Sequence, residues 1–199
     1  MYDINMNRTK LIYSILGITV GSLLTLFMTT NLISNNFKIR QTVSNSLDKH
    51  FIEQMIPHHE GAIDMAKLAQ KRSKNTNVLN LSESIIQSQS QEIIKMQTWY
   101  KDWYGKIPTS DSNLTNGMGR GMMHGGMMGG NTADTDLLEN SKNFDEDFLK
   151  EMIPHHQMAV MMAQMLLSGT DTPEMMQLAQ DIIKAQETEI TQMRSWLFE

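Results

Sequence analysis

The sequence predicts an all-α protein whose main part is a four-helix bundle, built from one helix hairpin used twice. Helix-forming residues dominate residues 48–100 and 145–199, and strand signals are scarce. The pentapeptide MIPHH occurs at residues 55–59 and again at 152–156. Apolar residues recur at helical spacing around both copies. Four amphipathic helices in two hairpins should bury their apolar faces against one another as a bundle.

The first element is an apolar segment near the N-terminus. Arg8 and Lys10 precede the uncharged residues 11–33, which are long enough to cross a hydrocarbon core of roughly 30 Å. The basic residues should stay in the cytoplasm, so the rest of the chain is expected outside it. We predict that residues 1–34 form a transmembrane signal anchor in the inner membrane. The alternative is a signal peptide that is cleaved and releases the protein; the length of the apolar core favours the anchor.

An internal repeat follows the apolar segment. When the chain is shifted by 97 residues, FIEQMIPHHEGAIDMAKLA (51–69) aligns with FLKEMIPHHQMAVMMAQML (148–166). The same shift aligns LSESIIQSQSQEIIKMQTWY (81–100) with LAQDIIKAQETEITQMRSWL (178–197), and neither alignment needs a gap. One structural unit is therefore used twice.

Each copy of the repeat is predicted to fold as a helix hairpin. The first hairpin covers residues 45–104 and the second covers residues 144–199, with a flexible Gly/Met-rich linker at 105–143. Pro57 and Pro154 fall inside helical patterns. Because proline removes a backbone hydrogen bond and clashes with the preceding turn, we expect a kink or a fresh helix start just before each histidine pair.

The paired histidines are the candidate metal ligands of the bundle. They lie beside methionines at helical offsets, and imidazole with thioether is a ligand set for copper, above all Cu(I). Glu92 and Glu189 lie within apolar stripes, where a carboxylate is rare unless paired. We expect them to orient the imidazoles by accepting the free N–H. The alternative is that His58 and His155 are core residues hydrogen-bonded to these glutamates. The predicted ligands are Met55, His58, His59, Met65, Met152, His155, His156, Met158, Met161 and Met162.

The linker carries a second candidate site. Residues 116–131 read NGMGRGMMHGGMMGGN, and glycine gives a backbone the freedom to wrap an ion. The chain has 19 methionines and no cysteine, which suits an oxidising compartment where thioethers still supply soft sulfur. The alternative is a low-complexity spacer. The predicted ligands of this soft-metal loop are Met118, Met122, Met123, His124, Met127 and Met128.

These motifs resemble a known family. The paired MIPHH segments, the return helices with their I–Q–E–M–W pattern and the N-terminal apolar stretch are similar to the CopM-like periplasmic copper-binding proteins, long catalogued as a domain of unknown function. The resemblance covers roughly residues 45–199. It implies a ferritin-like four-helix bundle that binds copper, and silver, in the periplasm and confers resistance to excess metal. The residues that match the family motif are His58, His59, Met65, His155, His156 and Met162.

Composition and motifs argue against two classes of protein, nucleic-acid-binding proteins and di-iron oxidases. With 17 basic and 22 acidic residues, the chain lacks the basic character of nucleic-acid-binding proteins. A di-iron oxidase needs two Glu-x-x-His motifs on the bundle helices, and none is present there. We therefore predict a non-enzymatic extracytoplasmic protein that binds Cu(I), or Cu(II) or Ag(I), for sequestration, resistance or transfer. A copper sensor or efflux component is the expected donor or acceptor. The alternatives are a membrane-anchored structural or adaptor bundle with Met as core filler and, less favoured, a metal-dependent oxidase.

Two properties of the predicted sites follow. Because free imidazole titrates near a pKa of ~6.5, copper held by the four histidines should be released below about pH 6. The second repeat should bind Cu(I) more tightly, because Met158 and Met161 replace Gly61 and Asp64 of the first.

Overall fold

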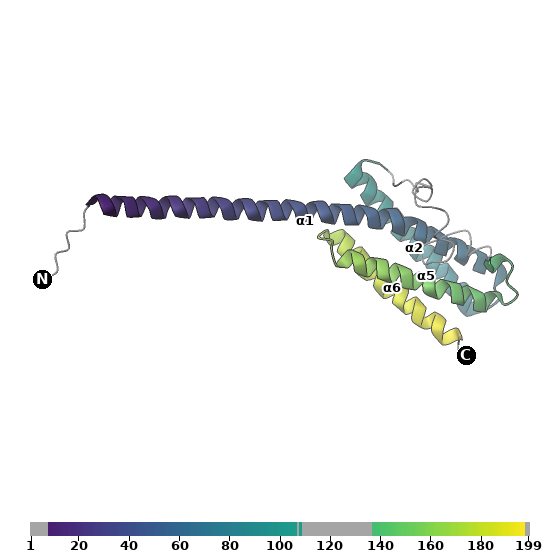
Figure 1. Ribbon diagram of the computed structural model, residues 1–199. Coiled ribbons are helices and arrows are strands. Elements are labelled where there is room, and N and C mark those ends of the chain that lie inside the picture. The colour runs from purple at the N-terminus through teal and green to yellow at the C-terminus, as the bar shows by residue number, and fades with distance from the viewer. Residues whose placement is uncertain (1–7, 107, 109–136, 198–199) are drawn as a thin grey trace, which may run out of the picture. The chain divides into compact units, whose positions relative to one another are not determined.

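The protein is all-α in a computed structural model that describes residues 8–106, 108 and 137–197. Those residues form four long helices: α1 (Arg8–Arg72), α2 (Thr76–Tyr104), α5 (Phe144–Leu167) and α6 (Pro173–Leu197) (Figure 1). No strand occurs among them. In α1 only the backbone is described at residues 8–18, 20, 24, 37 and 39.

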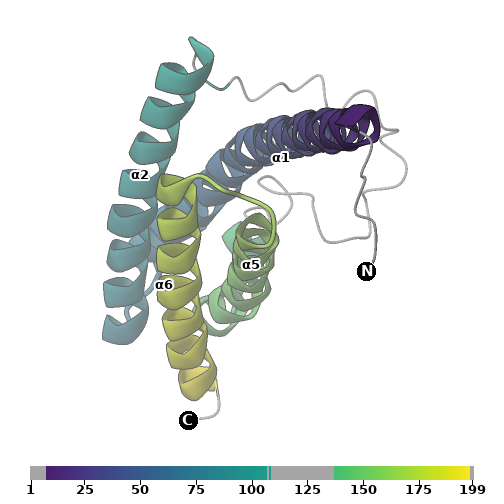
Figure 2. The same ribbon diagram turned by 90° about the vertical axis from the view of Figure 1, so that its left-hand side faces the viewer.

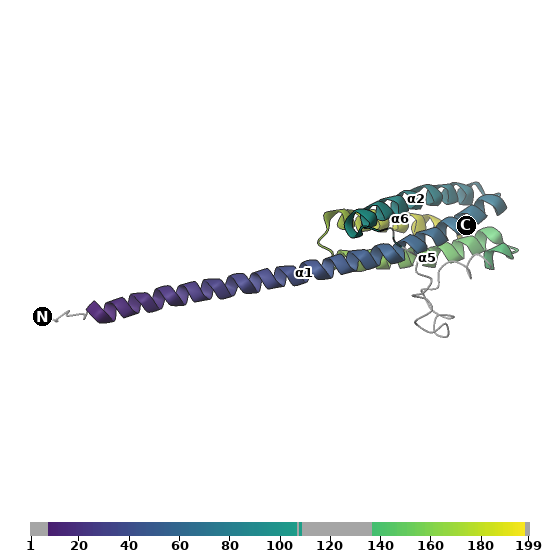
Figure 3. The same cartoon turned by 90° about the horizontal axis from the view of Figure 1, so that it is seen from above.

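The chain divides into two units, residues 1–43 and residues 44–199. The second unit contains the bundle, in which the C-terminal part of α1 pairs with α2 and α5 pairs with α6. Figure 2 and Figure 3 both show α2 beside α6 and α1 beside α5. All four helices are amphipathic in this unit, and their apolar faces close a common core. The predicted four-helix arrangement of two hairpins is therefore the architecture of residues 44–197.

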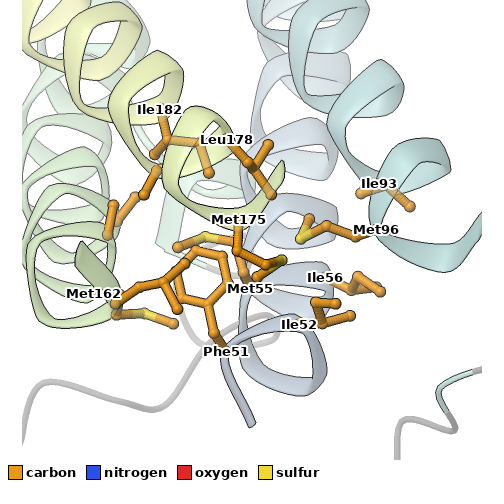
Figure 4. Close-up of a cluster of buried hydrophobic side chains, with 14 of the residues drawn as sticks. Phe51, Ile52, Met55, Ile56, Ile93, Met96, Met162, Met175, Leu178 and Ile182 are labelled. Atoms are coloured by element: carbon orange, nitrogen blue, oxygen red, sulfur yellow. The ribbon is translucent and has the colours of Figure 1, made fainter. Parts of the chain in front are cut away.

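The core consists of two hydrophobic clusters that mirror the repeat. Met55 and Met96 lie in the first cluster, which is drawn in Figure 4, and their equivalents Met152 and Met193 lie in the second. All four side chains are fully buried. Both hairpins contribute to each cluster, and these equivalent residues of the two hairpins fall in opposite clusters, as a repeat folded twice should place them.

The two prolines do not interrupt the helices. Pro57 lies inside α1 and Pro154 lies inside α5, and both helices continue through the histidine pairs. The expected fresh helix start at these prolines is wrong. A proline removes one backbone hydrogen bond, whereas buried neighbours such as Met55, His59 and Met152 hold the flanking turns in the core.

The last residues of the predicted flexible linker are packed. Leu138 is fully buried in the second hydrophobic cluster. The Arg72 guanidinium at the end of α1 donates to the carbonyl oxygens of Leu138, Glu139 and Ser141, and it lies over the Phe144 ring at 4.9 Å from the centroid. The predicted flexible linker therefore does not extend to residue 143, because a buried leucine and an arginine fix the chain just ahead of α5. Residues 109–136, with the predicted loop ligands, lie outside the described residues.

The predicted membrane anchor is described only in part. Over the residues that the structure describes, no helix combines the length and hydropathy of a membrane span. Residues 11–18, 20 and 24 of the predicted anchor have no described side chains. The anchor and the cleaved signal peptide remain predictions.

Candidate metal centre

Two histidine–glutamate pairs lie at equivalent positions of the two hairpins. His59 Nε2 on α1 is 2.6 Å from Glu92 Oε2 on α2, and His156 Nε2 on α5 is 2.7 Å from Glu189 Oε2 on α6. Both imidazoles are fully buried. Each pair joins the two helices of one hairpin, so the carboxylate fixes both the register of the hairpin and the orientation of the ring.

The glutamates pair with the second histidine of each motif. The core-residue alternative expected His58 and His155 as their partners, and the structure contradicts it. Successive helical residues point about 100° apart, so only one histidine of each motif can face the return helix of its own hairpin. The first histidine faces the other hairpin instead.

His58 and His155 meet between the hairpins. Their ring centroids are 3.8 Å apart and their planes are inclined by 42°. Burial, together with the nearby imidazoles of His59 and His156, lowers the pKa of His58 to about 3. Burial and the neighbouring His58 also hold the pKa of His155 well below its ordinary value. Both rings are therefore neutral at physiological pH, which is the protonation state that a metal ligand requires.

The lowered pKa values change the expected response to acid. Release of copper below about pH 6 assumed an ordinary histidine pKa, and this assumption is wrong for His58 and His155. Protons compete poorly for these two rings because burial disfavours the imidazolium and the neighbouring imidazoles disfavour it further.

The four imidazoles share one chemical feature. In each, Nδ1 is buried and has no hydrogen-bond partner among the described residues. In His59 and His156 the carboxylate faces Nε2, and the tautomer that donates to it from Nε2 has its lone pair on Nδ1. An unpartnered buried polar atom costs about 1–3 kcal/mol. These four atoms are the candidate nitrogen donors of the bundle, since a metal ion could use a lone pair on each.

The histidines do not form a complete site with carboxylates alone. Over the described residues, no group of three or more His, Cys, Asp or Glu side chains is placed to hold a metal ion. A metal bound here therefore needs other donors or a rearrangement of the imidazoles. The buried methionines are the available soft donors.

Two methionines accompany each histidine–glutamate pair. Met55 is four residues before His59, and Met96 is four residues after Glu92. Because α1 and α2 are antiparallel, Met55 and Met96 lie at one level, one turn from the pair. Figure 4 shows the Met55 and Met96 thioethers on facing sides of the first cluster, with Met175 beside them.

The second hairpin repeats this arrangement. Met152 and Met193 hold the same positions relative to His156 and Glu189. Met96 and Met193 were missed by the sequence analysis. The signal that could have found them is their offset of four residues from the glutamates, at the same place in both repeats.

The other predicted sulfur ligands are distributed over the bundle. Met65 is buried in the second cluster with Met152, whereas Met162 is buried in the first cluster with Met55. Met158 is half-buried and Met161 is exposed. The predicted ligands therefore divide between the two halves of the core and the surface of α5, and no single point unites them.

A pair of buried glutamines was also missed. Gln89 and Gln186 occupy equivalent positions, three residues before the glutamates, and are 2% and 3% exposed. Both amide atoms of Gln89 and the amide oxygen of Gln186 have no partner among the described residues. The polar interior of the bundle therefore extends one turn beyond each histidine–glutamate pair.

Fold and site together define a helical bundle made of two equivalent hairpins, each with an oriented buried histidine and nearby thioethers. The family model described as Domain of unknown function (DUF305) matches residues 48–197. The chain therefore belongs to this family, as the resemblance predicted.

Solved structures and one curated protein are similar to this chain. CopM in the Cu(II)-bound form is 42% identical, with a TM-score of 0.66, over 75% of this chain and 95% of that chain. CopM was also solved in Cu(I)-bound and Ag-bound forms. A structure from Streptomyces coelicolor, described as that of a secreted DUF305 protein, is 27% identical with a TM-score of 0.63, over 76% of this chain and 91% of that one. An uncharacterized protein of Acanthamoeba polyphaga mimivirus is 46% identical over 55 residues, which span only 36% of its length and 28% of this chain.

Proposed function

We propose that this protein binds copper, with Cu(I) as the favoured ion, and sequesters or transfers it outside the cytoplasm without catalysing a reaction. One observation carries the proposal: four imidazoles hold buried Nδ1 atoms that have no partner among the described residues, and two of these rings are each oriented by a glutamate. A purely structural bundle gains nothing from such atoms, because replacing them by apolar groups would remove their desolvation penalty.

The ligand types favour a soft ion. His58, His59, His155 and His156 supply nitrogen, and the adjacent thioethers supply sulfur. Met55 with Met96, and Met152 with Met193, are the nearest sulfur pairs to the oriented rings. Thioether and imidazole together suit Cu(I). The likeness to CopM, whose structures hold Cu(II), Cu(I) and Ag, supports copper and makes silver a suitable probe.

The remaining predicted sulfur ligands have lesser roles in this proposal. The more distant Met65 and Met162 would join only after a rearrangement of the core. Met118, Met122, Met123, Met127 and Met128, with His124, would form a separate scavenging site in the linker. Glu92 and Glu189 would raise the basicity of the rings that they orient.

The location follows from the N-terminal segment and from the relatives. The apolar residues 11–33 would anchor the protein in the membrane, or would be cleaved as a signal peptide. The likeness to a protein described as secreted supports a place outside the cytoplasm. A soluble metal donor or an efflux component would then be the partner that exchanges copper with the bundle.

Anaerobic titration of the full chain with Cu(I), in competition with a chromogenic chelator, tests the proposal. The wild-type protein should take up Cu(I), and a variant with both His59→Gln and His156→Gln should lose the tightest equivalents. His50→Gln is the matched control, because His50 is an exposed histidine on α1. If the double variant binds as the wild type does, the histidine core is not the site. If the wild type binds no Cu(I), the protein is a structural bundle.

A further inference from the structure

Three methionines on α5 lie outside the buried core. Met161 is 41% exposed, Met165 is 51% exposed and Met158 is half-buried. They follow the interior His155 at offsets of three, six and ten residues. We call Met158, Met161 and Met165 the methionine ladder.

The members of the methionine ladder follow His155 at intervals of about one helical turn. Residues three and four apart on a helix are neighbours, with Cβ atoms about 5–6 Å apart. The steps from His155 to Met158, to Met161 and to Met165 are three, three and four residues. A nitrogen or sulfur ligand is therefore available at every turn from the half-buried His155 imidazole to the exposed Met165 thioether.

Core packing accounts for Met158, which packs against the first hydrophobic cluster, but not for the exposed Met161 and Met165. Met162, which is buried, fills the first hydrophobic cluster, but an exposed methionine removes little apolar surface from water. The first repeat shows that the fold does not need thioethers here. Its equivalent residues are Gly61, Asp64 and Leu68, and Asp64 forms a surface ion pair with Lys67 at 3.1 Å.

We propose that the methionine ladder is the route by which a soft monovalent ion, Cu(I) or Ag(I), reaches and leaves the histidines of the second repeat. The inference rests on the proposed function of the bundle. A thioether is a neutral soft ligand that suits such ions and has no proton to displace. An ion can therefore pass from one sulfur to the next, and the histidines together with the core thioethers bind it at the end of the route. The first repeat has no such route, so the two halves of the core exchange metal at different rates.

Metal-exchange kinetics with the full chain test the route, with Ag(I) as the probe. The variant carries Met165→Leu, at the exposed end of the ladder, since leucine keeps volume and apolarity but has no sulfur. Transfer of bound Ag(I) to a competing chelator should slow about tenfold, as expected when one ligand contact on the path is lost. Equilibrium binding by the histidines should stay unchanged. Met176→Leu is the control, because Met176 is a half-buried methionine on α6 outside the ladder.

Oxidation of methionine by dilute peroxide gives an independent reading. One equivalent of Ag(I) should protect Met161 and Met165 from oxidation more than it protects Met176, as mass spectrometry of peptides would show. Transfer rates equal to those of the control, together with equal protection of all three residues, would refute the route while leaving the histidine site intact. Absence of Ag(I) binding by the wild type would refute the route and the proposed function together.

Discussion

Acid should destabilise the metal-free protein through its interior histidines. Burial lowers the pKa of His58 to about 3, and its ordinary value is 6.5. Above pH 6.5 the ring is neutral in both states and has no effect. Between these pH values the unfolded chain binds a proton that the folded chain excludes, so stability falls as pH falls. The loss ends when the pH reaches the folded-state pKa.

The size of the effect follows from the linkage. Each pH unit in this window costs about 1.4 kcal/mol for one such group. Lowering the pH from 7.5 to 4.5 should therefore remove about 2.5 kcal/mol of unfolding free energy through His58 alone. His155, whose pKa is lowered in the same direction, adds a loss of the same sign. This is a large share of the roughly 5–15 kcal/mol that stabilises a typical domain.

Urea unfolding of the metal-stripped full chain, followed by helix circular dichroism between pH 7.5 and 4.5, measures the loss. A variant with His58→Gln and His155→Gln should show a shallower dependence of unfolding free energy on pH, because glutamine does not titrate. His50→Gln, on the exposed side of α1, should keep the wild-type dependence. Equal losses in the wild type and the double variant would show that the two interior rings do not exclude the proton.

Three further predictions concern single features of the bundle. A variant with Glu92→Gln and Glu189→Gln should bind Cu(I) about 10–100-fold more weakly, with its helix content unchanged. Unchanged affinity in chelator competition would mean that the carboxylates only join the helices. Met96→Leu with Met193→Leu should cost less than about 1.5 kcal/mol in urea unfolding and should still lower Cu(I) affinity; an effect on stability alone would make both residues core filler. Arg72→Met should lower unfolding free energy by about 1–3 kcal/mol and leave Cu(I) stoichiometry unchanged; an unaltered thermal midpoint would contradict the anchoring of residues 137–141.

The repeat made the architecture predictable. An ungapped shift of 97 residues fixes two equal hairpins, and the apolar stripes fix which faces are buried. The pairing of a histidine with a glutamate was also predictable, since a carboxylate inside an apolar stripe needs a partner. Which histidine of each motif pairs with the glutamate depends on how α1 is rotated about its axis relative to α2. This rotation cannot be deduced from the sequence of one helix.

Other features depend on tertiary structure that local patterns do not encode. Pro57 indicates a helix boundary by its own chemistry, but packing of the surrounding turns keeps α1 continuous. The glycine-rich composition of the linker gave no sign that Arg72 would fix its last residues. The shared level of Met55 and Met96 needs the register of two antiparallel helices, which depends on tertiary contacts such as the His59–Glu92 and Tyr100–Glu53 hydrogen bonds.

The buried polar atoms of the bundle lower the stability of the metal-free protein, and the proposed function explains why they are present. Four Nδ1 atoms and the amide of Gln89 are buried without partners among the described residues, although the surrounding clusters are well packed and apolar. Each of these atoms opposes folding, so the bundle would be more stable without them. A ligand that binds them stabilises the folded state by its own binding free energy. If copper binds as proposed, the same atoms that weaken the metal-free bundle would couple its stability to metal, and the glutamates would hold two of the rings in the orientation that this coupling needs.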